Sequence, residues 1–270
     1  MNRHYFVLLL SLFCFLQTSP SLPSSIDDPD LAELSDTPAA ARSATPLTAA
    51  CASFNELNTR IRDRRIGRPA AQTELTRLLA GVRAEYYRAG GRDYPRSEWV
   101  FPLAGYDSRA IDGGRQHGYV PGGYDYYSGN SHGGHPALDI FIRDRNQDSL
   151  DDRSGRPVKV VALTGGVVVA LEREWEPGSP LRGGKYLWIY DPGSDLLVYY
   201  AHNNGLSVGL GEIVRPGDVL ASVGRSGYNA AKRRSPTHLH FSVLKVGSGG
   251  QVVPMDVYRE LKGARGVTAH

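Results

Sequence analysis

Two histidines, His238 and His240, alternate with apolar residues in one short stretch of this chain. If the stretch is a β-strand, Leu239, Phe241 and Val243 point to one face and both imidazoles to the other. At about 3.3 Å per residue, the two histidine Cα atoms would lie roughly 6.6 Å apart. One histidine could then bind a metal ion while the other acts beside it as an acid, a base or an oxyanion donor. Taken alone, the pattern equally suits a strand with two solvated histidines.

His135 and Asp139, a second pair of candidate ligands, open another predicted strand. Glycines precede His135 and Pro136 follows it, which argues against a helix, because proline disfavours the α region for the preceding residue. On a fully extended strand the two Cα atoms would be about 13 Å apart, too far to share an ion. Both side chains can reach one metal only if the chain bends between them, with His135 in a loop and Asp139 in the strand.

A third candidate, His202, closes the predicted strand 196–202. On its own it is equally an ordinary histidine at a strand edge. Histidine nitrogen and aspartate oxygen are usual zinc ligands, and three protein ligands leave a fourth position for water. Zinc lowers the pKa of such a water to around 7, which makes hydroxide available for attack on an amide. The three groups together, on strands of one β region, therefore indicate a zinc hydrolase.

The composition favours a mainly β protein. The 270 residues include 31 glycines, 17 prolines and 15 tyrosines, which favours short strands and tight turns over a helical bundle. No long helical stretch interrupts the predicted strands, so the sheet should be antiparallel. The predicted strands are 99–103, 137–142, 158–163, 166–172, 186–190, 196–202, 212–214, 219–223 and 238–246. The polar loop 106–134 is longer than a compact domain usually tolerates without a function.

Five segments follow from the composition along the chain. An apolar run behind Arg3 predicts a signal peptide over residues 1–21, with a retained anchor as the alternative. Ser, Pro, Ala and Thr dominate 22–50 and predict a disordered linker. Apolar residues at helical spacing predict a short helical segment over 51–95, broken near Gly67 into two helices. The β domain would follow over 96–262, with a tail at 263–270.

The signal peptide predicts an exported protein, periplasmic or extracellular and associated with the cell wall, with no stable membrane span after cleavage. Cys14 lies inside that peptide, so the mature chain would keep Cys51 as its single thiol and form no internal disulfide. The net charge of +3 is mild and suits contact with an anionic polymer, while nothing in the chain resembles a nucleic-acid motif. Lys232-Arg-Arg234 is either a solvated turn or a basic turn that favours binding of an acidic stem peptide.

Oxygen donors alternate over residues 144–152, much as they do in calcium loops. The candidate calcium ligands are Asp144, Asn146, Asp148 and Asp152. Ser149 replaces the glycine expected at the sixth position, and the twelfth position lacks a glutamate, so an EF-hand is excluded. Two interpretations of residues 144–152 remain, a calcium-binding half-loop and a solvated acidic turn.

The order of these motifs resembles the lysostaphin/LytM-type zinc metallopeptidases, which cut peptide bonds in bacterial peptidoglycan. The resemblance covers about residues 99–258 and rests on His135-x-x-x-Asp139, Gly155-Arg-Pro-Val158, Gly165-Gly-Val167, Tyr200-x-His202, Val214-x-Pro-Gly-Asp218, Gly224-x-Ser-Gly227 and His238-Leu-His-Phe241. It implies an antiparallel β-sheet metallopeptidase domain related to the biotinyl/lipoyl-like β fold. It also implies a zinc-dependent endopeptidase with one Zn²⁺ per chain and peptidoglycan peptides as substrates.

Carried over residue by residue, the resemblance implies three zinc ligands and two catalytic histidines, namely His135, Asp139 and His240, and His202 and His238. One catalytic histidine would accept a proton and the other would stabilise the oxyanion, and either assignment stands. A tyrosine in the loop before the first ligand is common in the family, which makes Tyr126 and Tyr127 candidates for contact with the substrate or the oxyanion.

Two other function classes compete with a peptidase. A family relative without activity could bind the cell wall or activate another wall hydrolase, but such relatives usually lack some of the five site residues. A biotinyl or lipoyl carrier would need a lysine at an exposed hairpin tip, and the chain shows none in that setting. The sequence leaves open which peptidoglycan bond is cut and the oligomeric state.

Overall fold

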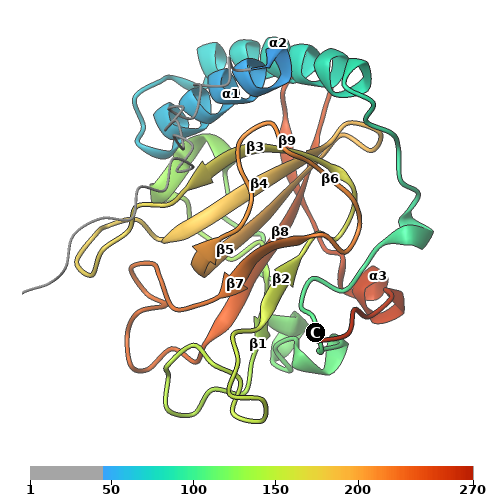
Figure 1. The fold of residues 1–270 in the computed structure, drawn as a ribbon. Coiled ribbons are helices and arrows are strands. Elements are labelled where there is room, and N and C mark those ends of the chain that lie inside the picture. The colour runs from blue at the N-terminus through green and yellow to red at the C-terminus, as the bar shows by residue number, and fades with distance from the viewer. Residues whose placement is uncertain (1–44, 270) are drawn as a thin grey trace, which may run out of the picture. The chain divides into compact units, whose positions relative to one another are not determined.

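The framework of the protein is one nine-stranded antiparallel sheet, seen in a computed structural model that describes residues 45–269 (Figure 1). Its strands are β1 (Leu138–Phe141), β2 (Lys159–Val161), β3 (Gly166–Glu172), β4 (Lys185–Asp191), β5 (Leu196–Leu206), β6 (Ile213–Val214), β7 (Val219–Val223), β8 (His238–Val246) and β9 (Val252–Met255). The main path runs β1-β8-β5-β4-β3-β6, β7 pairs with β2 and β5, and β9 pairs with β8. The predicted antiparallel β fold is therefore confirmed.

The strand predictions differ from the structure at both ends of the β region. The stretch 99–103 forms only isolated bridges, through Val100 and Leu103, and not a strand. Its residues are nevertheless buried, and Leu103 is in the hydrophobic core although it has no regular ladder. Strand β9, which contains Pro254, was not predicted from the sequence. A proline is tolerated there because β9 pairs only with β8 and is an edge strand.

Side chains along β8 alternate between the two faces of the sheet. Leu239, Phe241 and Val243 belong to one hydrophobic core. The other face carries, in order along the strand, His238, His240, Ser242, Leu244 and Val246. The last two of these belong to a second core. One face of one strand is therefore polar where the strand begins and apolar where it ends.

Two helices, α1 (Pro46–Arg62) and α2 (Arg68–Arg88), cover the face to which the second core belongs. They cross one side of the sheet, as Figure 1 shows, and α1 packs against β3. Phe54 and Leu57 of α1 and Leu75 of α2 are at most 1% exposed and join residues of β3, β4, β5 and β8 in that core. The helical segment is thus part of the packed domain.

Helix α1 begins inside the segment 22–50 that was predicted to be a disordered linker, so the end of that prediction is corrected. Thr45 caps the helix, because its side chain accepts a hydrogen bond from the backbone N–H of Thr48 at 3.1 Å. Pro46 follows at the first helical turn, where its missing N–H costs nothing. The two helices contain 17 and 21 residues, so they are longer than the short helices expected.

The first core is closed by segments from both ends of the domain, including Trp99, Phe101 and Leu261. Leu261 belongs to α3 (Tyr258–Gly263), a helix that was not predicted from the sequence. The remaining regular elements are four 3-10 helices, η1 (Arg96–Glu98), η2 (Ser108–Ala110), η3 (Arg115–Gly118) and η4 (Tyr126–Ser131). Three of the four lie in the long loop 106–134.

None of the helices between residues 45 and 269 has the length and hydrophobicity that crossing a bilayer requires. The predicted signal peptide, including Cys14, and most of the predicted linker lie outside the described residues. Cys51 is a free, buried thiol on α1.

Candidate metal centre

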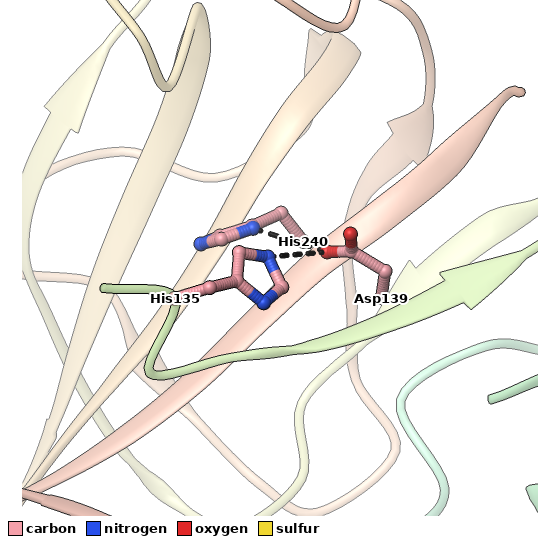
Figure 2. A group of neighbouring side chains, drawn as sticks. All are labelled: His135, Asp139 and His240. Atoms are coloured by element: carbon pink, nitrogen blue, oxygen red, sulfur yellow. Dashed lines mark hydrogen bonds and ion pairs between the residues drawn. The ribbon is translucent and has the colours of Figure 1, made fainter. Parts of the chain in front are cut away.

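The three side chains predicted to bind zinc converge where β1 meets β8. The antiparallel register places Asp139 of β1 opposite His240 of β8. Asp139 Oδ1 lies 3.1 Å from His240 Nδ1 and 3.3 Å from His135 Nε2. Figure 2 shows both imidazoles pointing at this carboxylate, with His135 in the loop before β1. The chain therefore bends between His135 and Asp139, as a shared ion would require.

The donor set fits a tetrahedral zinc ion. One ligand atom from each of the three residues lies within 4.8 Å of the other two. Zinc–ligand bonds of about 2.0–2.1 Å place the corners of a tetrahedron roughly 3.3 Å apart, close to the two distances measured at Asp139. Within residues 45–269, no other group of three histidines, cysteines or acidic residues lies this close together. Three protein ligands would leave one position of the ion open.

Backbone carbonyls fix the tautomers of three histidines at this site. The hydrogen bonds are His135 Nδ1 to Gly118 O at 2.8 Å, His202 Nδ1 to Ser226 O at 2.8 Å, and His238 Nδ1 to Pro236 O at 2.7 Å. A carbonyl oxygen only accepts, so each Nδ1 carries the proton and each neutral ring keeps a lone pair at Nε2. His240 is turned the other way, with Nδ1 toward Asp139.

The two predicted catalytic histidines lie directly beside the ligand cluster. His238 Nε2 is 3.7 Å from Asp139 Oδ2. The ring of His202 lies 4.9 Å from that of His238 and 5.4 Å from that of His240, between ring centroids. Both are buried, at 9% exposure for His202 and 7% for His238. A cleft of about 240 Å³ is lined by both of them and by all three predicted ligands.

The Gly224-x-Ser-Gly227 motif positions His202. The carbonyl of Ser226 accepts the hydrogen bond from His202 Nδ1. Gly227 has φ +112°, and a Cβ there would lie 2.4 Å from the carbonyl oxygen of Arg182 and 2.8 Å from His202 Nδ1. Only glycine fits at this position, because any side chain would collide with the backbone on one side and the imidazole on the other.

The pKa shifts of Asp139, His202 and His240 suit metal binding, whereas that of His135 opposes it. Burial alone would raise the pKa of Asp139, but its interactions with His135 and His240 hold it well below its usual value. Burial lowers the pKa of His240, although Asp139 offsets part of this effect. Burial, with the neighbouring histidines, lowers the pKa of His202 well below its usual value. Burial also acts to lower the pKa of His135, but Asp139 outweighs it and the pKa is raised. Metal ligation needs the carboxylate charged and the imidazoles neutral.

Neither tyrosine predicted for the site lines the cleft. Tyr126 is buried, and its hydroxyl donates to Asn58 Oδ1 on α1 at 3.3 Å. The hydroxyl of Tyr127 donates to the carbonyl of Gly250, near β9. Tyr199 of β5 lies nearer the metal ligands, with its ring centroid 6.0 Å from that of His240. The phenols of Tyr126 and Tyr127 are thus engaged in holding η4 against its neighbours.

The predicted calcium ligands bond to one another and to the local backbone. The Asp144 carboxylate accepts the backbone N–H groups of Asp148 at 3.0 Å and Ser149 at 2.8 Å. The Asn146 amide donates to Asp148 Oδ2 at 2.7 Å, and Asp152 accepts a backbone N–H. The three carboxylates do not form a close group of the kind found at Asp139. This geometry adds no support for calcium, which stays a prediction.

The same acidic loop supports the turn that precedes His238. Asp144 Oδ2 accepts the hydroxyl hydrogen bond of Thr237 at 2.6 Å, and both residues are buried. Gln147 donates from Nε2 to the carbonyl of Arg233 at 2.9 Å. The loop therefore fixes the backbone from which His238 starts.

Sequence reasoning missed Arg182, which lines the cleft from the segment between β3 and β4. Its Nη1 donates to the carbonyl of His132 at 2.7 Å, and its backbone N–H donates to Asn130 Oδ1 at 3.1 Å. No motif surrounds it except two glycines that follow, so nothing in the sequence separates it from a surface arginine.

Comparisons with known proteins find similarity to peptidases over part of the chain. Residues 146–254 match the family model described as peptidase family M23. The match includes His202, His238 and His240, whereas His135 and Asp139 precede it. The L-Ala–D-Glu endopeptidase of Bacillus subtilis (strain 168) is 45% identical over 51 residues, or 17% of this chain. The aligned part spans only 16% of the length of that curated relative.

Several solved structures also resemble the chain. The catalytic domain of lysostaphin from Staphylococcus simulans is 23% identical over 54% of this chain and 90% of its own, with a TM-score of 0.36. A putative glycyl-glycine endopeptidase lytM from Ruminococcus gnavus is 19% identical over 82% of this chain and 89% of its own, with a TM-score of 0.39. A zinc-containing peptidase from Vibrio cholerae is 22% identical over 62% of this chain and 41% of its own, with a TM-score of 0.37.

Proposed function

We propose that the chain is a member of peptidase family M23, whose model matches residues 146–254, and that it is a zinc-dependent endopeptidase acting on peptide bonds of peptidoglycan. The observation that carries the proposal is the convergence of Asp139, His135 and His240 at zinc-like spacing. His202 and His238 in the same cleft supply the proton-transfer groups that hydrolysis needs. All five side chains are present, which argues against a catalytically silent relative.

His135 Nε2, Asp139 Oδ1 and His240 Nδ1 would hold the ion, because both imidazole nitrogens lie close to this carboxylate oxygen. When bound, zinc would lower the pKa of a water molecule and polarise the scissile carbonyl. The hydrogen bond from Nδ1 of His135 to a backbone carbonyl keeps its Nε2 free for ligation. The carboxylate of Asp139 is anchored by the pairing of β1 with β8.

Proton transfer falls to His202 and His238. Each keeps Nδ1–H on a backbone carbonyl, so each can accept a proton only at Nε2. The ring that takes the proton of the attacking water becomes an imidazolium, and its Nε2–H can then pass that proton to the leaving amine. An oxyanion donor also needs a proton at Nε2. Before the attack, the base therefore needs a free Nε2 and the oxyanion donor needs a protonated Nε2, and either histidine can take either role.

The substrate and the location belong to the same proposal. The predicted signal peptide would export the chain to the periplasm or the cell exterior, where peptidoglycan peptides are available. The curated relative over 51 residues is named for cleavage of an L-Ala–D-Glu bond, which is a bond of the peptidoglycan stem. We propose stem peptides or their cross-links as the substrate class.

Digestion of defined muropeptides by the purified chain tests the proposal. We expect cleavage of a peptide bond, read by mass spectrometry, with about one zinc per chain by elemental analysis. A chelator should abolish cleavage, and added zinc should restore it. His240→Ala should lose both the zinc and the cleavage. The control is Ser53→Ala, a change of an exposed side chain on α1, which should lose neither. Full cleavage by metal-free protein would refute the proposal.

A further inference from the structure

An aromatic cavity adjoins the metal cleft on the side of α1. Its volume is about 100 Å³, and its walls include Tyr126, Tyr186, Trp188 and Tyr199. Tyr199 stacks on Trp188 with ring centroids 4.3 Å apart. His240 lines both the cavity and the cleft, so the two spaces meet at a predicted zinc ligand.

Arg182 lies where the two spaces meet, because it also lines both. The side chain is half-buried and held in place, since Nη1 donates to the carbonyl of His132 at 2.7 Å. The backbone N–H of Arg182 is fixed as well, by Asn130 Oδ1 at 3.1 Å. A guanidinium has five N–H donors, so most of them remain for another acceptor.

No carboxylate of the described residues forms an ion pair with Arg182. Asp139 is the only acidic residue that lines the cleft, and it already faces the two histidines of the ligand cluster. The aromatic cavity has no acidic residue in its lining. Arg62, the other cation at the cavity, differs in this respect, because it pairs with Asp63 and with Glu172, each at 2.7 Å.

We propose that Arg182 is a specificity-determining residue that binds a free carboxylate of the substrate, so that the site selects acidic stem peptides over their amidated forms. The inference rests on the proposed peptidase function and names a chemical feature of its substrate. A half-buried guanidinium held by a backbone carbonyl pairs with a planar carboxylate by two parallel hydrogen bonds, which a carboxamide cannot match.

A three-peptide comparison tests this assignment. The probes are the stem peptide L-Ala-γ-D-Glu-L-Lys-D-Ala with all carboxyl groups free, with the D-Glu carboxyl amidated, and with the C-terminal carboxyl amidated. For the wild-type chain with zinc, we expect amidation at one of the two positions to lower kcat/KM by about tenfold, mainly through KM. In Arg182→Gln the three peptides should be cleaved with equal kcat/KM. Arg182→Lys should keep part of the preference.

Arg173→Gln is the matched control, because Arg173 also donates to backbone carbonyls, including that of Leu206 at 2.9 Å, but lines neither space. It should keep the wild-type preference. The preference is a ratio within one variant, so partial loss of folded enzyme does not change it. The assignment is overturned if the wild-type chain cleaves all three peptides equally, or if Arg182→Gln retains the tenfold preference.

Failure of the peptidase proposal would look different. If the zinc-loaded chain cleaves none of the peptides, the proposed function fails for this substrate class, and calorimetric titration with the same three peptides then decides the role of Arg182. Tighter binding of the free-carboxylate peptide that disappears in Arg182→Gln would support the assignment. Equal or undetectable binding of all three would overturn it.

Discussion

The two ends of one face of β8 have opposite surroundings. At the start of the strand, His238 and His240 face a cleft and meet Asp139. At its end, Leu244 and Val246 are covered in the core that α1 and α2 complete. β8 is paired antiparallel along its whole length, with β1 beside its start and β9 beside its end, so the two ends differ in their side chains and in what covers them.

The comparison shows how a single strand can carry both a site and a core. Packing at the apolar end holds the strand in register, and that register places Asp139 opposite His240 at the polar end. Stability and chemistry are therefore separated along nine residues of one strand. Within β8, replacing a histidine should therefore affect function more than stability, and replacing an apolar side chain should affect stability more than function.

The largest effect is expected at the polar end. His240→Ala removes one of three predicted ligands, so zinc affinity and peptide cleavage should each fall by more than about 100-fold. The free energy of unfolding of the metal-free chain should stay within about 1 kcal/mol of wild type, because no core contact is lost. Elemental analysis and urea unfolding in chelator measure the two quantities. A large loss of stability in the metal-free His240→Ala variant would contradict the separation of function and stability along β8.

The next effect is expected at the apolar end. Phe54→Ala on α1 removes a side chain that is 1% exposed, and should lower the free energy of unfolding by about 3–5 kcal/mol. Zinc content of the folded fraction should remain near one per chain. The control is Ser53→Ala, an exposed neighbour on the same helix, which should be close to wild type in urea unfolding.

Cys51 provides a direct reporter for this helix. Its side chain is fully buried, and burial raises the pKa of the thiol to about 12. The native protein should therefore react slowly with a thiol reagent, while Phe54→Ala should react faster because α1 detaches more often. Equal rates in the two proteins would show that α1 stays in place without this anchor.

A smaller effect is expected where the acidic loop supports the polar end. Asp144→Ala leaves the Thr237 hydroxyl and two backbone N–H groups without their acceptor, and should cost about 1–3 kcal/mol of stability. The rate of cleavage should also fall, because the turn before His238 loosens, while zinc content is kept. Asp148→Ala, an exposed change in the same loop, is the control. A calcium-induced rise in Tm that Asp148→Ala removes would instead support a calcium site.

The smallest effect is expected at the charged turn. Arg233 is exposed, and only its backbone carbonyl has a partner, Gln147. Arg233→Gln should change the free energy of unfolding by less than about 0.5 kcal/mol. It should also leave the preference among the three peptides unchanged, in contrast to Arg182→Gln. If Arg233→Gln loses the preference among the three peptides, the charged turn and not Arg182 selects acidic peptides.

The sequence predicted most of what depends on local pattern. The alternation over 238–246 gave the correct bounds of β8, and the bend expected between His135 and Asp139 is present. Features that depend on distant contacts could not be predicted in this way. Arg182 reaches the cleft only through the pairing of far segments, and the donors near Asp144 bind their own backbone instead of a common centre. Spacing along the chain carries no information on either arrangement.

Helix α1 has a consequence for how such a chain could mature. It fills the second core with Phe54 and lines the aromatic cavity with Ile61 and Arg62. A removable propeptide has to leave without exposing apolar surface, and α1 cannot do so. Proteolytic processing compatible with a stable enzyme should therefore occur before residue 45, and a recombinant fragment starting after α2 should be poorly folded.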